Sequence, residues 1–213
     1  MEDSKDLKTL ENSVDYKTRG RGEKSLPTQF NFLKEKLMIF IDGGNLFGAV
    51  KEKNIKIDFR KLADFLAEGF NLIRVYYYTG VPTLKSWDKS RDSKKQFKEK
   101  ISNQIKFLDG LEFNYNFHVV KKPLSFDKGF LKEKGVDVNI ASDIIWHGLS
   151  DNYDSFILIS GDRDLMDCLM RMKDNGKKVI VANFENRISR EIKKIADKYI
   201  NLSDYLEEIK RNY

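Results

Sequence analysis

Residues 37–45 read Leu-Met-Ile-Phe-Ile-Asp-Gly-Gly-Asn, an apolar run that ends in a carboxylate and two glycines. A second run of this kind covers Phe156–Ser160 and continues into Gly-Asp-Arg-Asp at 161–164. Unbroken apolar runs of this length are typical of buried strands in α/β proteins. Ligands of such proteins bind beyond the carboxyl ends of the strands, so we expect these aspartates to face one crevice.

A third carboxylate follows a Lys-Gly turn. Residues 134–138 read Lys-Gly-Val-Asp-Val and open an apolar helix that we expect over 136–149. Four aspartates (42, 137, 162 and 164) in one crevice would repel one another unless a cation neutralised them. Oxygen ligands of this kind select Mg²⁺ or Mn²⁺. A divalent ion held by carboxylates is the usual equipment for phosphodiester chemistry.

Each of these residues also has a purely structural explanation. Asp42 is placed to cap the next helix, and Asn45 either caps that helix or orients Asp42 and a phosphate oxygen. Asp137 gains from the helix dipole in a first turn whether or not it binds a ligand. Ser160 is placed to hydrogen-bond Asp42 or a phosphate. Asp143 lies about 240° around the helix from Asp137, so it cannot share its face, and two roles stay open for it, reaching the rim of the cleft or bracing the site.

From residue 36 onward, strands alternate with helices, which predicts a parallel sheet covered on both sides. Residues 1–33 are polar and charge-balanced, and predict a flexible arm before a domain at 34–213. A loop with Pro123 and Gly129 is expected to lead to Lys134. The expected strands cover 37–41, 72–79, 112–121, 156–160, 178–182 and 199–201. The expected helices cover 45–53, a segment capped by Asp58, 88–108, 136–149, 164–175, 189–197 and 203–211.

The chain has 213 residues, of which 40% are hydrophobic and 34% charged, as in soluble globular domains. It has no run of 18 apolar residues and no apolar segment at the N-terminus, so we expect no membrane span, no secretory signal and a cytoplasmic location. The lone Cys168 excludes an intramolecular disulfide and a cysteine-based zinc site.

Positive charge is concentrated in one part of the chain. The formal net charge is +6, and residues 85–134 alone hold 13 Lys and Arg against 7 Asp and Glu. A localised basic face indicates a polyanionic partner, although Lys-rich helices are also commonly just solvated. The lysines that we expect to hold this partner are Lys94, Lys95, Lys98, Lys121 and Lys122.

The aromatic residues and histidines favour structural roles. We expect the strand tyrosines at 76–78 to line the core rather than stack on bases, and His147 to pack beside Trp146. His118 is isolated, and Trp87 lies in a basic loop where stacking on a base is more plausible.

Several of these motifs together resemble the NYN domains, relatives of the PIN-domain ribonucleases. The matching pieces follow the family's order and are Ile41–Asn45, Lys134–Val138, Ile159–Asp164, Gly176–Val179, Ser189 and Ile195–Leu202. Family members often carry Phe after the last of these aspartates, where this chain has Leu165. That exchange keeps an apolar contact and leaves the carboxylates in place.

The resemblance implies a PIN-like three-layer α/β/α fold with a central, mainly parallel sheet of about five strands. It also implies cleavage of RNA, which we expect to be single-stranded, with Mg²⁺ or Mn²⁺. On this reading the catalytic and metal-binding residues are Asp42, Asp137, Asp162 and Asp164, supported by Asn45, Ser160, Asp143 and Lys134. We expect no membrane partner and leave a homo-oligomer open.

Two other functions were weighed. One is a non-catalytic RNA-binding or scaffold module of the same fold, which the loss of a carboxylate would favour; all four are present. The other is a phosphatase or a nucleotide-binding protein. The chain lacks a G-x-x-x-x-G-K-[ST] loop, and Gly44 stands where an aspartyl phosphatase carries its second Asp.

Overall fold

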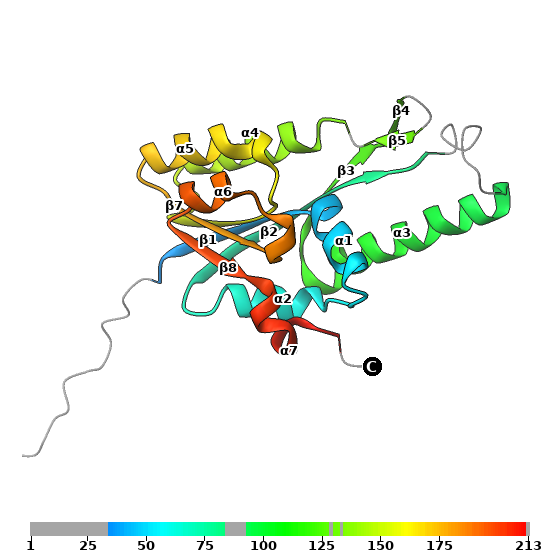
Figure 1. The fold of residues 1–213 in the computed structure, drawn as a ribbon, viewed down its shortest axis with the longest axis horizontal. Coiled ribbons are helices and arrows are strands. Elements are labelled where there is room, and N and C mark those ends of the chain that lie inside the picture. The colour runs from blue at the N-terminus through cyan, green and yellow to red at the C-terminus, as the bar shows by residue number, and fades with distance from the viewer. Residues whose placement is uncertain (1–33, 84–92, 128–129, 133, 212–213) are drawn as a thin grey trace, which may run out of the picture. The chain divides into compact units, whose positions relative to one another are not determined.

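The computed structural model describes residues 34–83, 93–127, 130–132 and 134–211. The arm predicted over 1–33 and the loop with Trp87 lie outside these ranges. Within them, six strands form one parallel sheet in the order β3-β2-β1-β6-β7-β8 (Figure 1). The strands are β1 (Lys36–Asp42), β2 (Asn71–Val81), β3 (His118–Pro123), β6 (Ser155–Ile159), β7 (Lys178–Asn183) and β8 (Lys198–Asn201).

Helices cover both faces of this sheet, as Figure 1 shows. One face is covered by α1 (Gly43–Glu52), α2 (Phe59–Leu66), α3 (Lys94–Tyr115) and α7 (Leu206–Ile209). The other is covered by α4 (Val136–Leu149), α5 (Met166–Asp174) and α6 (Arg190–Ile195). Short 3₁₀ turns lie at η2 (Arg163–Leu165), η3 (Glu185–Arg187) and η4 (Leu202–Tyr205). The predicted three-layer α/β/α domain with a mainly parallel sheet is confirmed, and its described sheet has six strands rather than about five.

Alternating residues of the central strand β1 serve two separate cores. Leu37, Ile39 and Ile41 point to the face of α1 and α2, whereas Met38 and Phe40 point to the face of α4 and α5. All five are at most 2% exposed. A strand buried on both faces needs apolar residues at every position, which explains the unbroken run in the sequence.

The boundary between α3 and β3 was predicted wrongly. Residues 112–115, expected to begin a strand, form the last turn of α3, and β3 begins only at His118. The alternation of Leu111, Phe113, Tyr115 and Phe117 imitates a strand. The helix continues because Leu108 and Leu111, one turn apart, are both buried, and Asn116 ends it in the left-handed conformation.

The start of α3 and the following loop also differ from expectation. The helix begins at Lys94 rather than near residue 88, because Ser93 and Gln96 form a reciprocal capping box. Part of the segment expected as a loop before Lys134 is a small antiparallel hairpin of β4 (Ser125–Asp127) and β5 (Phe130–Lys132). Among the described helices, none is both long and apolar enough to cross a membrane.

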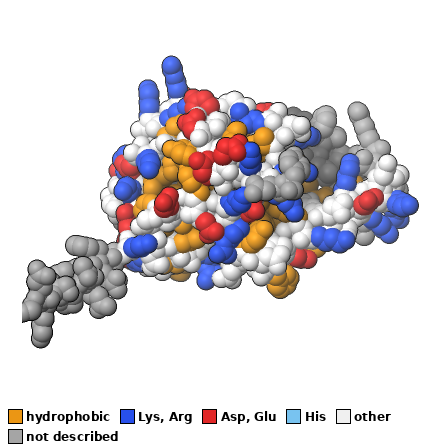
Figure 2. Space-filling view, turned by 90° about the horizontal axis from the view of Figure 1, so that it is seen from below, with side chains coloured by type: hydrophobic (Ala, Val, Ile, Leu, Met, Phe, Trp, Pro, Cys, Tyr) orange, Lys and Arg blue, Asp and Glu red, His pale blue; other side chains and the backbone are white. Residues whose placement is uncertain are grey.

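The face seen from below in Figure 2 carries apolar side chains scattered among charged ones, with lysines along the protruding part of α3. Phe113 on α3 is 84% exposed and Tyr205 on η4 is 38% exposed. Scattered exposed apolar residues are ordinary on a protein surface.

Close packing of α4 on α5 depends on Gly148. A Cβ at this position would lie 2.4 Å from the Met172 sulfur and 2.6 Å from the Tyr153 hydroxyl oxygen. That hydroxyl donates a 2.7 Å hydrogen bond to the Ile144 carbonyl oxygen. Both Met172 and Tyr153 are buried, so neither has free space into which to move.

We therefore expect Gly148→Ala to lower the free energy of unfolding by about 1–3 kcal/mol, the usual cost of overpacking a core. The control is Gly110→Ala on α3, where the nearest atom to the new Cβ is the Asn114 amide nitrogen at 3.8 Å. That change should be neutral or stabilising by up to about 1 kcal/mol, since alanine favours helix. Urea denaturation of both variants measures the difference. Equal stabilities would contradict the packing argument.

Candidate active site

The carboxylate of Asp42 stands at the end of β1 and is held from two directions. Its Oδ1 accepts a 2.9 Å hydrogen bond from the Asn45 backbone N–H, which caps α1. Its Oδ2 accepts a 2.9 Å hydrogen bond from the Ser160 hydroxyl. The side chain is only 5% exposed. Asp42 therefore caps α1 through one carboxylate oxygen, and Ser160 at the end of the neighbouring strand holds the other.

Ser160 joins the ends of two adjacent strands. The register pairs Ile41 of β1 with Ile159 of β6, so the residues that follow lie side by side. Ser160 is fully buried, and its hydroxyl oxygen also accepts a 3.2 Å hydrogen bond from the Asp162 backbone N–H. One hydroxyl thus connects the first carboxylate to the loop that carries the next two.

The loop after β6 bears Asp162 and Asp164. Asp162 caps η2 by accepting a 3.0 Å hydrogen bond from the Asp164 backbone N–H, and Asp164 itself is exposed. Only glycine fits before them, because a Cβ at Gly161 would lie 1.7 Å from the Arg187 carbonyl oxygen. At Gly161 the chain thus passes directly against the backbone of Arg187, the last residue of η3.

Asp137 is the member of the cluster whose pKa shows the effect of the other carboxylates. It lies in the first turn of α4, after Gly135 in the left-handed conformation with φ 76°. Burial raises the pKa of Asp137, and the nearby carboxylates of Asp162, Asp42 and Asp164 raise it further. The three segments that the sequence pointed to therefore lie close enough, near the carboxyl ends of β1 and β6, for their carboxylates to interact through their charge.

The chemistry of this donor set fits a hard divalent cation, since it consists of oxygens with an excess of negative charge. Within the described ranges, however, no group of three or more His, Cys, Asp or Glu side chains is arranged to hold a metal ion as it stands. The four carboxylates interact through their charge, without forming a preassembled ligand shell.

Asn183 is a site residue that the sequence reasoning missed. It ends β7, is fully buried, and its amide nitrogen donates to the Asn45 side-chain oxygen at 2.9 Å and the Arg187 carbonyl at 3.0 Å. Its own side-chain oxygen accepts a 2.8 Å hydrogen bond from the Phe184 N–H. The signal was a polar residue directly after the apolar stretch 179–182, the same pattern that revealed Asp42.

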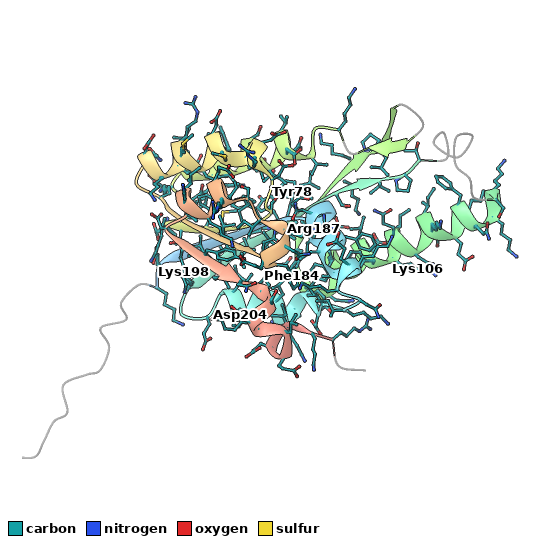
Figure 3. All side chains as sticks on the ribbon, in the orientation of Figure 1. Tyr78, Lys106, Phe184, Arg187, Lys198 and Asp204 are labelled. Atoms are coloured by element: carbon teal, nitrogen blue, oxygen red, sulfur yellow. The ribbon has the colours of Figure 1, made fainter. Side chains whose placement is uncertain are left out.

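Arg187, the last residue of η3, lies close to Gly48 of α1 (Figure 3). Its guanidinium pairs with Glu52 at the end of α1, with a 3.1 Å hydrogen bond from Nε. The end of β7 is thus bonded to the start of α1 through Asn183, and η3 is bonded to the end of α1 through Arg187.

Asp143 lies apart from the cluster. It accepts a 2.8 Å hydrogen bond from the hydroxyl of Tyr78, which is fully buried and pairs with Asp42 in the sheet register. Burial and the Asp143 charge raise the pKa of Tyr78. A second phenol, Tyr76, lies 2.9 Å from Nε2 of His147. These two contacts attach α4 to β2, which agrees with a bracing role for Asp143 and a packed role for His147.

The expected RNA-binding lysines have different surroundings. Lys94, Lys95 and Lys98 are exposed on the first turns of α3, and Lys134 is exposed just before α4. Lys121 is also exposed and pairs with Glu112 at 2.9 Å and Asp109 at 3.7 Å. The neighbouring Lys122 is half-buried. Exposure on one helix makes the α3 lysines candidates for contacts with a polyanion.

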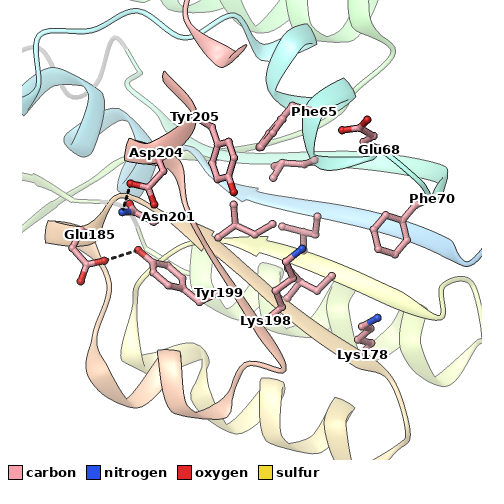
Figure 4. A pocket seen from close by; sticks show the side chains of 14 residues that line it. Phe65, Glu68, Phe70, Lys178, Glu185, Lys198, Tyr199, Asn201, Asp204 and Tyr205 are labelled. Carbon is pink, nitrogen blue, oxygen red and sulfur yellow. Dashed lines mark hydrogen bonds between the residues drawn. The ribbon is translucent and has the colours of Figure 1, made fainter. Parts of the chain in front are cut away.

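A hollow of about 690 Å³ lies elsewhere, between α2, β7, β8 and η4 (Figure 4). Its lining includes Ile157, Ile180 and Ile200, and Lys178 and Lys198 at the starts of β7 and β8. None of the four aspartates lines it, so it is separate from the candidate active site.

Three comparisons place this geometry among known proteins. A family model described as the NYN domain matches residues 36–204. The low amplitude and bright protein LabA of Synechococcus elongatus is 24% identical over 187 residues, which cover 84% of this chain and 92% of that protein. The crystal structure of a protein of unknown function from Vibrio parahaemolyticus has a TM-score of 0.61 and 22% identity. It covers 84% of this chain and 98% of that one, and the likeness shows a shared fold.

Burial of Asp137 and charge repulsion within the cluster lead to a prediction for the metal-free protein. Because the folded state raises the pKa of Asp137, its ionised form destabilises the fold. This loss of stability is absent below the pKa that Asp137 has in the unfolded chain, and it is complete above the pKa that Asp137 has in the folded protein. We expect Asp137→Asn to raise the melting temperature at neutral pH in chelator, with the gain shrinking as the pH falls toward the acidic range.

The matched control is Asp167→Asn, which removes a charge from the first turn of α5. It should be neutral or cost about 0.3–1 kcal/mol, because only the favourable interaction with the helix dipole is lost. Melting curves of both variants between acidic and neutral pH make the comparison. A melting temperature of the Asp137 variant at or below that of the wild type at neutral pH would contradict the repulsion.

Proposed function

Because the chain belongs to the NYN domain family, matched over residues 36–204, we propose that it is a metal-dependent ribonuclease that hydrolyses phosphodiester bonds of single-stranded RNA. The observation that carries the proposal is the convergence of Asp42, Asp137, Asp162 and Asp164 from three separate segments onto one edge of the sheet. Capping explains the positions of Asp42 and Asp162, and the helix dipole explains that of Asp137, but neither explains why the four charges lie close enough to interact.

The four aspartates are the residues that would hold Mg²⁺ or Mn²⁺. A divalent ion bound there supplies Lewis-acid stabilisation of the charge that develops on the phosphoryl group. Ser160 and the Asn45 N–H keep the Asp42 carboxylate in one orientation. Asp164, which is exposed, has its carboxylate open to a water molecule, so it is suited to orient the attacking water and to accept its proton.

The exposed lysines of α3 and Lys134 would hold the phosphate backbone of the strand. Charge of this kind binds without regard to sequence and fixes the register of the substrate. Lys121 contributes less in this proposal, since two carboxylates already pair with it.

The second candidate is a non-catalytic RNA-binding module. It is favoured by one observation, namely that no three potential ligands among the described residues are arranged to hold a metal ion. It keeps the basic helix and predicts RNA binding without cleavage, so the same experiments separate the two functions.

The ribonuclease proposal predicts cleavage that depends on both the ion and the aspartates. A labelled single-stranded RNA should be cut with Mg²⁺ or Mn²⁺ and left intact in chelator. Asp42→Asn, Asp137→Asn and Asp162→Asn should each lower kcat/KM by more than roughly 100-fold, since even residues that only orient metal ligands are worth about 10- to 100-fold. Asn caps a helix about as well as Asp, so the fold should survive.

Asp167→Asn serves as the control and should cleave like the wild type. Undiminished cleavage after thorough chelation would exclude metal dependence. Three active Asn variants would remove the catalytic assignment, and three unfolded ones would make these aspartates structural. RNA binding by a wild type that never cleaves would favour the second candidate.

A separate prediction concerns the basic helix. The double replacement Lys95→Ala and Lys98→Ala should weaken RNA binding for all sequences. It should also make the slope of log K against log salt concentration shallower by up to about 1.4, at roughly 0.7 per phosphate contact with a single strand. Fluorescence anisotropy at several salt concentrations gives the slope.

The control replaces Lys178 and Lys198 with Ala, which removes the same charge at the starts of β7 and β8, at the sheet edge opposite the aspartates. Its slope should match that of the wild type. If both double variants change the slope equally, RNA does not bind along α3 in particular.

A further inference from the structure

Phe47, in the second turn of α1, is a large apolar side chain that is 64% exposed. Single exposed apolar residues are ordinary on protein surfaces, so exposure alone says nothing about function. The position of Phe47 in the helix that begins at Asp42 is what distinguishes it.

The surroundings of Gly43 show which way this side of α1 faces. Residues four apart lie on the same side of a helix, so Gly43 marks the side of Phe47 one turn earlier. A Cβ at Gly43 would lie 2.6 Å from the ring of Tyr77 on β2. The Tyr77 ring in turn meets Phe107 of α3 edge-on, with centroids 5.9 Å apart. Phe47 therefore leaves α1 on the side of β2 and α3.

The carboxylate of Asp42 lies a short distance from Phe47 along α1. Phe47 is five residues after Asp42, which is about 7 Å along the helix axis. Helical side chains generally lean toward the N-terminus and cover the preceding turn, which is the direction of Asp42. The preceding turn at this side consists of Gly43 and Gly44, which have no side chains to cover the ring.

We propose that Phe47 is a stacking platform for a base of the RNA strand, beside the acidic cluster and on the side of α1 that faces β2. The inference rests on the proposed ribonuclease function. An aromatic ring stacks on every base without reading its identity, which suits an enzyme whose other contacts are to phosphates. Stacking next to the aspartates would add affinity for the strand without touching the reacting atoms.

The test compares Phe47→Leu, which keeps an apolar side chain without a ring, with Phe47→Trp, which keeps an aromatic face. Kd for a labelled single-stranded RNA is measured in chelator, and KM and kcat with Mg²⁺. We expect Phe47→Leu to raise Kd and KM on the order of tenfold, the usual worth of one stacked base. The Trp variant should stay within about twofold of the wild type, and kcat should change little in either.

A second probe locates the stacked base. Single-stranded RNAs with one abasic position, moved along the strand, should bind the wild type weakly at one position. At that position Phe47→Leu should have no further effect. The control is Phe113→Leu, since Phe113 is 84% exposed but lies in the last turn of α3, just before β3 begins. Its Kd and KM should equal those of the wild type.

The inference is overturned if the wild type cleaves RNA and Phe47→Leu matches it in Kd and KM, or if Phe113→Leu loses as much affinity. It is also overturned if no abasic position removes the difference between wild type and Phe47→Leu. A wild type that neither binds nor cleaves RNA would instead refute the ribonuclease proposal, and with it the stacking. Unchanged melting temperatures of the variants show that the fold is intact.

Discussion

The hydrogen bond from the Ser160 hydroxyl to Asp42 determines how the whole site is built. A carboxylate that is only 5% exposed is costly unless donors compensate for the water it has lost. Here a backbone N–H of α1 and a buried hydroxyl at the end of β6 do so. The positive end of the α1 dipole adds to this compensation. The register of β1 and β6 brings the two partners together, so the sheet itself supports the charge.

Part of this arrangement was readable from the chain because the physics is local. A doubly buried strand shows as an unbroken apolar run, and parallel strands all deliver their carboxyl ends to one edge. Those two facts were enough to place Asp42, Ser160 and Asp162 near one another. The charge interaction of Asp137 with the others was also expected, although the resemblance, more than any pattern in the helix, pointed to that residue.

What the sequence left out depends on contacts between distant segments. The approach of the Arg187 carbonyl to Gly161 and the bond from Asn183 to Asn45 are set by how the loop after β7 folds back. The boundary between α3 and β3 was predicted wrongly for a different reason. The apolar residues before it fit both the helical and the strand period, and only the burial of Leu108 and Leu111 against the sheet selects the helix.

The attachment of α4 to β2 has a consequence for how the protein responds to ions. The bonds from Tyr78 to Asp143 and between Tyr76 and His147 fix the helix, so Asp137 cannot move away from its neighbours by sliding α4. The repulsion is then retained in the folded state, and the divalent cation of the proposed function would relieve it there. Folding and ion binding would then be thermodynamically linked, and a free concentration of 100 times Kd would add about 2.7 kcal/mol of stability. In that case the persistence of the fold would itself depend on the divalent ions around the protein.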